Sequence, residues 1–434
     1  MDYSLDELEA WDDKIKVISD RLQLDPFEIE YEAIDYRSMI AAMTFHGLPS
    51  HFNHWSFGKA FERTHYAYNA GVEGLPYELI ANSNPAIAYL MRENPLYLQI
   101  LIMAHCVGHS DFFKNNRTFK GTRPDTIVGR CRSAKKRFQE YVEDPDIGIH
   151  KVEATIDACH SVQFQGMRPG WIRRTRDEII DEHEDRRRDV EELEALDTDR
   201  NPLQPDYDIL GFIAEEADLP DWKKDIVEVC RDEGQYFWPQ MQTKIMNEGW
   251  ACLCHYTILN DLDLDPDLHV AFVKSHNQVV RPHVGGINPY HLGFHLFQKI
   301  KERHGYEECL LAREVHNDAS FLRQYLTQED CEDLNLFSYS FKKNGDTSID
   351  DVSDEEGWEE VKKNIVAQVG GGSIPVLRVE DCKRDGTLVM GHEHDGRDLD
   401  IIETKATLDH IWYLWDNPVV LNTIIDGSSY KFTT

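Results

Sequence analysis

The sequence lacks the features that mark membrane, secreted and disulfide-rich proteins. Its 434 residues contain no apolar run near the roughly 18 residues that a membrane-spanning helix requires, and no secretory signal is recognisable. Its nine cysteines are odd in number and form no Cys-x-x-Cys pair, so a disulfide framework is not expected. We therefore predict a soluble, cytoplasmic protein.

The sequence is also poor in basic residues. It has 46 Lys and Arg against 79 Asp and Glu, a net charge of −33, and lysine is the scarcer of the two cations. This charge opposes binding to nucleic acid and to anionic membranes, since both depend on clustered basic side chains. High salt screens such self-repulsion, so the composition predicts a halophilic protein, of the kind expected in a haloarchaeon. An acidic interaction surface is the alternative.

A phosphate-binding loop is missing too, because the three glycines at 370–372 are not followed by the Lys and Ser or Thr of that motif. What is present is helical periodicity over most of the chain and alternating strands near its end. The fold class predicted is mainly α, a zincin-like or bundle-like helical body with a small C-terminal α+β domain. We divide the chain into a helical region 1–173, a charged and mobile linker or insertion 174–206, a helical region 207–334 and an α+β domain 335–434.

Two histidines end an apolar helix in the stretch "LIMAHCVGHSDFF". His105 and His109 are four residues apart, so both imidazoles lie on one helix face and can meet one metal ion. A second apolar helix, in "TKIMNEGWACLCHY", presents Glu248 and His255 nearly on one face. Because buried charge is costly without a partner, we expect the two helices to face each other. The candidate metal ligands are therefore His105, His109 and Glu248, with zinc as the expected ion.

Peptidases of the His-x-x-x-His type carry a glutamate general base directly after the first histidine, but this chain has Cys106 there. A base must then come from elsewhere. Our candidates for catalytic or supporting groups are Asp111, Asp157 and His255, with Glu153 as a further possibility.

A polar stripe on a predicted helix over 149–165 offers a different chemistry. His150, Glu153, Asp157 and His160 recur along one face of this helix. Carboxylates and histidines from helices of a bundle can build a two-metal site, which is the chemistry of a di-metal oxidoreductase. A solvated helix face explains the same pattern without a ligand.

Several stretches together resemble the stage V sporulation protein R (SpoVR) family. The resemblance is carried, in order between residues 46 and 326, by "HFNHWSFGKAFE", "YELIANSNPAIAYLM", "MAHCVGHSDFFKNN", "YFWPQMQTKIMNEGWA", "GINPYHLGFHLF" and "DASFLRQYLT". Bacterial members are tied to spore-cortex formation, and other members occur in organisms that form no spores. A peptidoglycan cortex cannot be the substrate in a haloarchaeon.

The resemblance implies two readings of function, and the polar stripe adds a third. The first is a divergent, zincin-like metal-dependent hydrolase in a stress-response module, with peptidase-like chemistry as one option. The second is a non-catalytic regulatory or scaffold protein that acts with a PrkA-type serine protein kinase, a partner expected together with a von Willebrand-A-like protein. The third is the di-metal oxidoreductase. Metal content separates them, because they require one zinc, no metal, and two irons or manganeses respectively.

Overall fold

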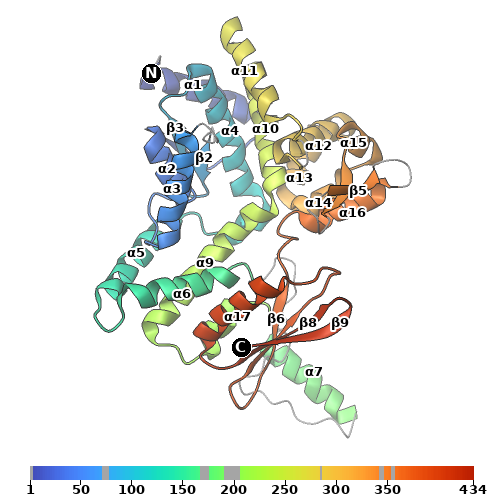
Figure 1. The fold of residues 1–434 in the computed structure, drawn as a ribbon. Coiled ribbons are helices and arrows are strands. Elements are labelled where there is room, and N and C mark those ends of the chain that lie inside the picture. Colours follow the sequence, from blue (N-terminus) through green and yellow to red (C-terminus); the bar gives the residue numbers. More distant parts are fainter. Residues whose placement is uncertain are drawn as a thin grey trace. The chain divides into compact units, whose positions relative to one another are not determined.

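We describe the protein from a computed structural model that covers residues 3–70, 78–166, 175–189, 206–283, 286–341, 347–352 and 357–434. The predicted fold class is confirmed, since the chain is mainly helical and ends in a small domain of four strands and a helix (Figure 1). Two compact units are present. The first unit comprises Met1–Lys135 and Phe237–Ser373, and the second comprises Lys136–Tyr236 and Ile374–Thr434.

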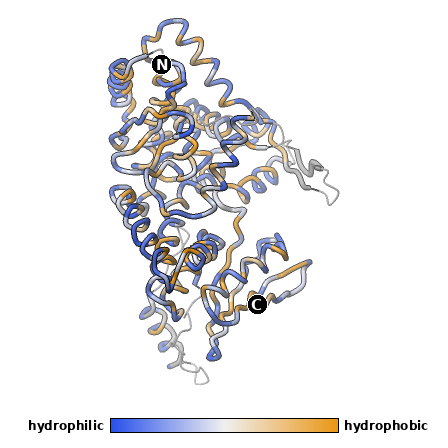
Figure 2. Tube along the Cα trace, turned by 60° about the vertical axis from the view of Figure 1, so that its left-hand side comes forward, coloured by the Kyte–Doolittle hydropathy of each residue, from blue (hydrophilic) through white to orange (hydrophobic). Residues whose placement is uncertain are grey.

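Three helices form the centre of the first unit, namely α4 (Leu96–Asn115), α10 (Lys244–Asp261) and α12 (Pro289–His304). Pro95 precedes α4 as its N-cap, and sixteen consecutive residues of α4 are buried. Around these helices lie α1 (Leu5–Arg21), α2 (Tyr36–Thr44), α3 (Trp55–Asn69), η1 (Arg117–Gly121), α11 (Pro266–Val279), α13 (Tyr306–Val315), α14 (Asp318–Tyr325), α15 (Gln328–Asp333) and α16 (Trp358–Gln368). Helices α5 (Ile127–Glu143) and α9 (Asp221–Gln242) contribute residues to both units. Most helices alternate between hydrophilic and hydrophobic residues along their length, as amphipathic helices do (Figure 2).

Glycines allow the central helices to approach closely. A Cβ on Gly108 of α4 would lie 2.6 Å from the Cα of Ala251 on α10. On the other side of α10, a Cβ on Gly249 would collide with the backbone of Gly293 on α12. Such short approaches exclude any side chain at these positions. They bring the histidine face of α4 against the glutamate face of α10.

A small sheet in the first unit was not predicted from the sequence. Strand β3 (Ala86–Met91) pairs in parallel with β1 (Ile29–Ile34), with Ile29 opposite Ala86, and in antiparallel fashion with β2 (Leu79–Ala81). Residues 86–90 are buried without alternation, which is why a period of two was not visible. A further strand pair, β4 (Phe337–Phe341) with β5 (Thr347–Val352), follows α15.

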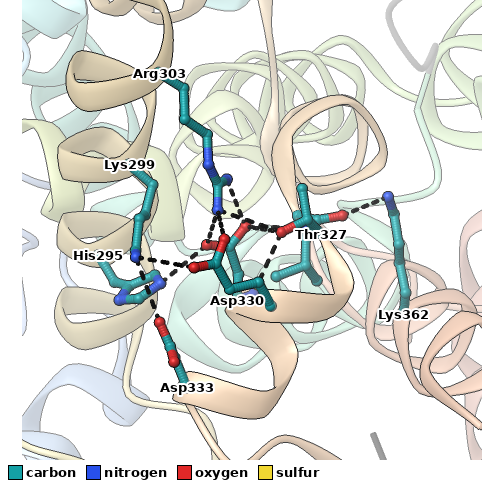
Figure 3. Close-up of polar contacts among 9 residues, drawn as sticks. His295, Lys299, Arg303, Thr327, Asp330, Asp333 and Lys362 are labelled. Atoms are coloured by element: carbon teal, nitrogen blue, oxygen red, sulfur yellow. Dashed lines mark hydrogen bonds and ion pairs between the residues drawn. The ribbon is translucent and has the colours of Figure 1, made fainter. Parts of the chain in front are cut away.

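A buried carboxylate fixes α12 to the helices that follow it. Asp330 is fully buried and accepts hydrogen bonds from two nitrogens of Arg303, at 2.9 and 3.0 Å, and from the hydroxyl of Thr327, at 2.7 Å (Figure 3). His295 contacts the same carboxylate at 3.2 Å. Burial opposes ionisation of Asp330, but its hydrogen-bond partners hold its pKa well below the usual value. Lys362 of α16 donates to a carbonyl oxygen beside this network, at Leu326.

The second unit contains the predicted strands. The sheet has the order β6 (Leu377–Cys382), β7 (Leu388–His392), β8 (Val419–Ile425) and β9 (Ser428–Thr433). A turn at Asp426 and Gly427, the Asp-Gly pair that favours tight hairpins, closes the β8–β9 hairpin with φ values of 49° and 72°. Strands β7 and β8 are parallel and are joined through α17 (Ile401–Trp415). The unit also contains α6 (Gly148–Val162), α7 (Arg176–Asp189) and α8 (Ile209–Glu216).

The segment predicted as a charged linker, 174–206, contains α7, and its residues 190–205 lie outside the described part of the chain. Residues 335–373, which we grouped with the C-terminal domain, are assigned by their contacts to the first unit. Among the described residues, no helix is long and apolar enough to cross a membrane.

Candidate metal centre

The two histidines of α4 and the glutamate of α10 converge in the first unit. Glu248 Oε2 lies 3.6 Å from His105 Nε2 and 3.4 Å from His109 Nε2. The two imidazole rings stand nearly perpendicular, with their centroids 4.5 Å apart. Both histidines are buried, and the side chain of Glu248 is 17% exposed. The structure thus brings the three predicted ligands together.

The spacing of these atoms fits one small cation. Tetrahedral ligands at about 2.0–2.2 Å from a zinc ion lie about 3.3–3.6 Å from each other. The distances from Glu248 Oε2 to the two Nε2 atoms match this range. Moreover, His105 Nε2 and Glu248 Oε2 are buried polar atoms that have no hydrogen-bond partner. Leaving such atoms unsatisfied is costly, and a bound cation would satisfy both.

The other nitrogen of each imidazole is held by a second layer of side chains. His109 Nδ1 lies 2.9 Å from Asn247 Oδ1, which only accepts, so Nδ1 carries the proton and Nε2 is left with a lone pair when the ring is neutral. His105 Nδ1 lies 2.8 Å from His255 Nδ1, and His255 Nε2 lies 2.7 Å from His276 Nδ1. Metal-binding histidines are usually oriented in this way by a partner on the far nitrogen.

A fourth polar side chain, Glu78, was missed by the sequence analysis. It directly precedes β2, and its Oε1 lies 3.7 Å from His105 Nε2. The hydroxyl of Tyr290 on α12 donates to the same oxygen at 3.2 Å. One ligand atom from each of Glu78, His105, His109 and Glu248 lies within 4.8 Å of the others. Because Glu78 stands before the unpredicted sheet, no periodicity in the sequence pointed to it.

Burial and charge set the protonation of the cluster. Burial disfavours the imidazolium of His109, but the carboxylate of Glu248 outweighs this and raises the pKa of His109. Burial also opposes ionisation of Glu248, yet the two imidazoles hold the pKa of that carboxyl well below its usual value. Burial and the nearby charge of His105 lower the pKa of His255 well below its usual value and that of His276 to about 4. The centre therefore presents a carboxylate to its histidines and a neutral pair of imidazoles behind them.

The predicted supporting residues have different places. His255 is in the second layer described above. Asp111 is fully buried in a separate network, where it accepts hydrogen bonds from Trp250 Nε1 at 2.8 Å and from the backbone N–H of Asp25 at 2.8 Å. Arg313 lies 3.3 Å from the same carboxylate. These partners occupy both oxygens of Asp111, so we assign it a structural role.

The predicted polar stripe lies on α6 in the second unit. Among the described residues, His160 groups with Cys230 and Glu233 of α9 as possible ligands, whereas Glu153 and Asp157 belong to no such group. A third group, His105 with Cys252 and His255, shares its histidine with the centre of the first unit.

The fold and the site define a mainly helical protein with a buried cluster of two histidines and two glutamates. The chain belongs to the SpoVR family, because the family model described as "SpoVR like protein" matches residues 2–374 and that described as "SpoVR-like C-terminal domain" matches residues 373–426. It is 32% identical to "Uncharacterized protein YcgB" of Escherichia coli (strain K12), over 97% of this chain and 92% of the relative. No solved structure matches it.

Proposed function

We propose that the chain is a metal-dependent hydrolase whose zinc ion is held by His105, His109 and Glu248. The observation that carries the proposal is a pair of buried atoms without a hydrogen-bond partner, His105 Nε2 and Glu248 Oε2, at a separation that suits two ligands of one ion. Two imidazoles and one carboxylate leave a fourth position for water or substrate, as in catalytic zinc sites. When bound, zinc acts as a Lewis acid and makes water a stronger acid.

Glu78 supplies the general base that the sequence motif lacks. Cys106 cannot serve, because burial raises the pKa of its thiol well above the usual value and the side chain lies in the core. The side chain of Glu78 is 14% exposed and adjoins His105, so its carboxylate can take the proton of an attacking water. Its position before a strand, not on α4, separates this site from the motif with Glu after the first histidine.

The hydroxyl of Tyr290 is placed to assist the proposed hydrolysis. Burial raises the pKa of its phenol far above the usual value, so the hydroxyl remains a hydrogen-bond donor. In the free protein it donates to Glu78. During hydrolysis the same hydroxyl can donate to the oxygen on which negative charge develops.

The test separates metal binding from chemistry. Zinc content is measured for the wild type, Glu78→Gln and His109→Ala, with His304→Ala, an exposed histidine on α12, as the control. Hydrolysis is followed with fluorogenic peptides and nitrophenyl esters. We expect His109→Ala to lose the zinc of this centre, and Glu78→Gln to keep it while the rate falls about 100-fold or more.

Two results would contradict the proposal. Full zinc content in His109→Ala would remove the metal site from this cluster. A zinc-loaded wild type without hydrolytic activity on these probes, or an undiminished rate in Glu78→Gln, would leave a metal site but exclude the assigned chemistry.

A further inference from the structure

A second group of ligand-type side chains lies in the second unit, independent of the centre described above. Cys230 and Glu233 are three residues apart on α9, so they share one helix face, and His160 comes from α6. One ligand atom from each of the three lies within 4.8 Å of the other two. The distance between His160 Nε2 and Glu233 Oε2 is 3.8 Å. Cys230 is fully buried, and the side chains of His160 and Glu233 are 22% and 14% exposed.

The backbone brings α6 and α9 together at this point. Gly234 follows Glu233, and a Cβ there would collide with the backbone carbonyl of Gln163, the residue after α6. A thiol, an imidazole and a carboxylate are thus gathered where the two helices meet.

We propose that His160, Cys230 and Glu233 bind a second zinc ion. Thiolate and imidazole ligands favour zinc over magnesium and calcium, which prefer oxygen. The charges also balance, since a thiolate and a carboxylate offset the double charge of the ion while the imidazole stays neutral. The separation of 3.8 Å is close to the roughly 3.3–3.6 Å between tetrahedral zinc ligands. On binding, the thiol of Cys230 and the imidazolium of His160 each release one proton to solvent.

The ligand set indicates a different role from that of the first centre. This group includes a thiolate, a ligand typical of structural zinc sites, whereas the first centre has only imidazole and carboxylate ligands. The ion would link α6 to α9 within the second unit. Its loss would therefore affect the stability of this unit and leave the hydrolytic centre with its own metal.

Cobalt(II) distinguishes the two sites in the full-length chain. A cobalt ion bound by thiolate gives a sulfur-to-metal charge-transfer band in the near ultraviolet, which a site made of histidine and glutamate does not give. Metal-free protein is titrated with cobalt chloride as wild type, Cys230→Ser, Glu233→Gln and His109→Ala. Cys252→Ser is the matched control, because Cys252 is a fully buried cysteine of another ligand-type group.

We expect the wild type, His109→Ala and Cys252→Ser to show the band and Cys230→Ser to lose it. Glu233→Gln, which keeps the size of the side chain, should weaken cobalt binding at this site about tenfold or more. Circular dichroism of each variant shows that it is folded. The proposal is overturned if the wild type gives no thiolate band, if the band persists in Cys230→Ser, or if Glu233→Gln binds as tightly as the wild type. Because His109→Ala removes only the first centre, loss of metal binding at one site can be distinguished from loss at the other.

Discussion

At the scale of single residues, the orientation of each histidine depends on one partner. Asn247 accepts from His109 Nδ1, and His255 contacts His105 Nδ1. Both contacts direct Nε2 toward Glu248. The ability of the two imidazoles to bind one ion together therefore depends on these partners.

Asn247→Ala should lower zinc affinity without unfolding the protein. The substitution removes the acceptor that fixes the His109 ring, and alanine is well tolerated in a helix. We expect zinc affinity to fall about 10–100-fold, measured by competition with a chromophoric chelator. The control is Asn260→Ala on the same helix. The exposed side chain of Asn260 donates a hydrogen bond to the carbonyl oxygen of Tyr256. Equal affinities in the two variants would contradict the role given to Asn247.

The sequence could reveal residues of this centre only where spacing carries information. His105 and His109 are one helical turn apart in an apolar segment, and Glu248 is a charged residue in another, so their convergence could be predicted. Glu78 stands alone before a three-residue strand, and Tyr290 looks like any aromatic residue at the start of a helix. Asp111 cannot be assigned from sequence, because a buried carboxylate with structural partners has the same residue pattern there as a catalytic one.

At the scale of helices and strands, the centre depends on how closely α4, α10 and α12 pack. The long helices were visible as apolar periodicity, and the hairpin at Asp426 and Gly427 as a turn signal. The sheet formed by β1, β2 and β3 was not visible. Strand β1 pairs with β3, a segment far along the chain, and β2 has only three residues, so local patterns do not record this sheet.

Gly108→Ala should separate α4 from α10. Its new Cβ would lie 2.6 Å from the Cα of Ala251, and backbone atoms cannot move aside cheaply. We expect a loss of about 1–3 kcal/mol in the free energy of unfolding, measured by urea denaturation, together with weaker zinc binding. The control is Gly58→Ala in α3, where a Cβ would meet nothing within 4 Å and should stabilise the helix slightly. Similar effects of both substitutions would argue against close packing at Gly108.

Asp318 makes the stability of α10 depend on pH. It is buried and accepts hydrogen bonds from the backbone N–H groups of Ile245 and Met246, each at 2.9 Å, at the start of this helix. Burial outweighs these bonds and raises the pKa of Asp318 to about 7, from 3.8. The folded state then binds the proton more tightly than the unfolded state. The stabilisation that protonated Asp318 gives the fold is therefore complete below pH 3.8 and is lost as the pH rises through 7.

The expected signature is a difference between wild type and Asp318→Asn. The stability of the wild type relative to this variant should decrease as pH rises from about 4 to about 7 and then level off. Urea denaturation of both proteins across this range measures it. A relative stability that is constant or increases with pH would show that the carboxyl is ionised throughout.

At the scale of the whole molecule, the net charge of −33 is the dominant feature. Mutual repulsion among acidic groups favours the unfolded chain, and salt screens it over about 3 Å at 1 M. We expect the melting temperature to rise steadily as KCl is increased from low to molar concentration. Calorimetry measures this directly, and a melting temperature unaffected by KCl would contradict the halophilic interpretation.

The central claim, that one metal ion is held where α4 meets α10, is tested most directly by anomalous diffraction at the zinc absorption edge from crystals of the zinc-loaded protein. The account predicts an anomalous peak about 2.0–2.2 Å from His105 Nε2, His109 Nε2 and a carboxylate oxygen of Glu248. Crystals that contain zinc elsewhere, with no anomalous peak between these three side chains, would contradict it.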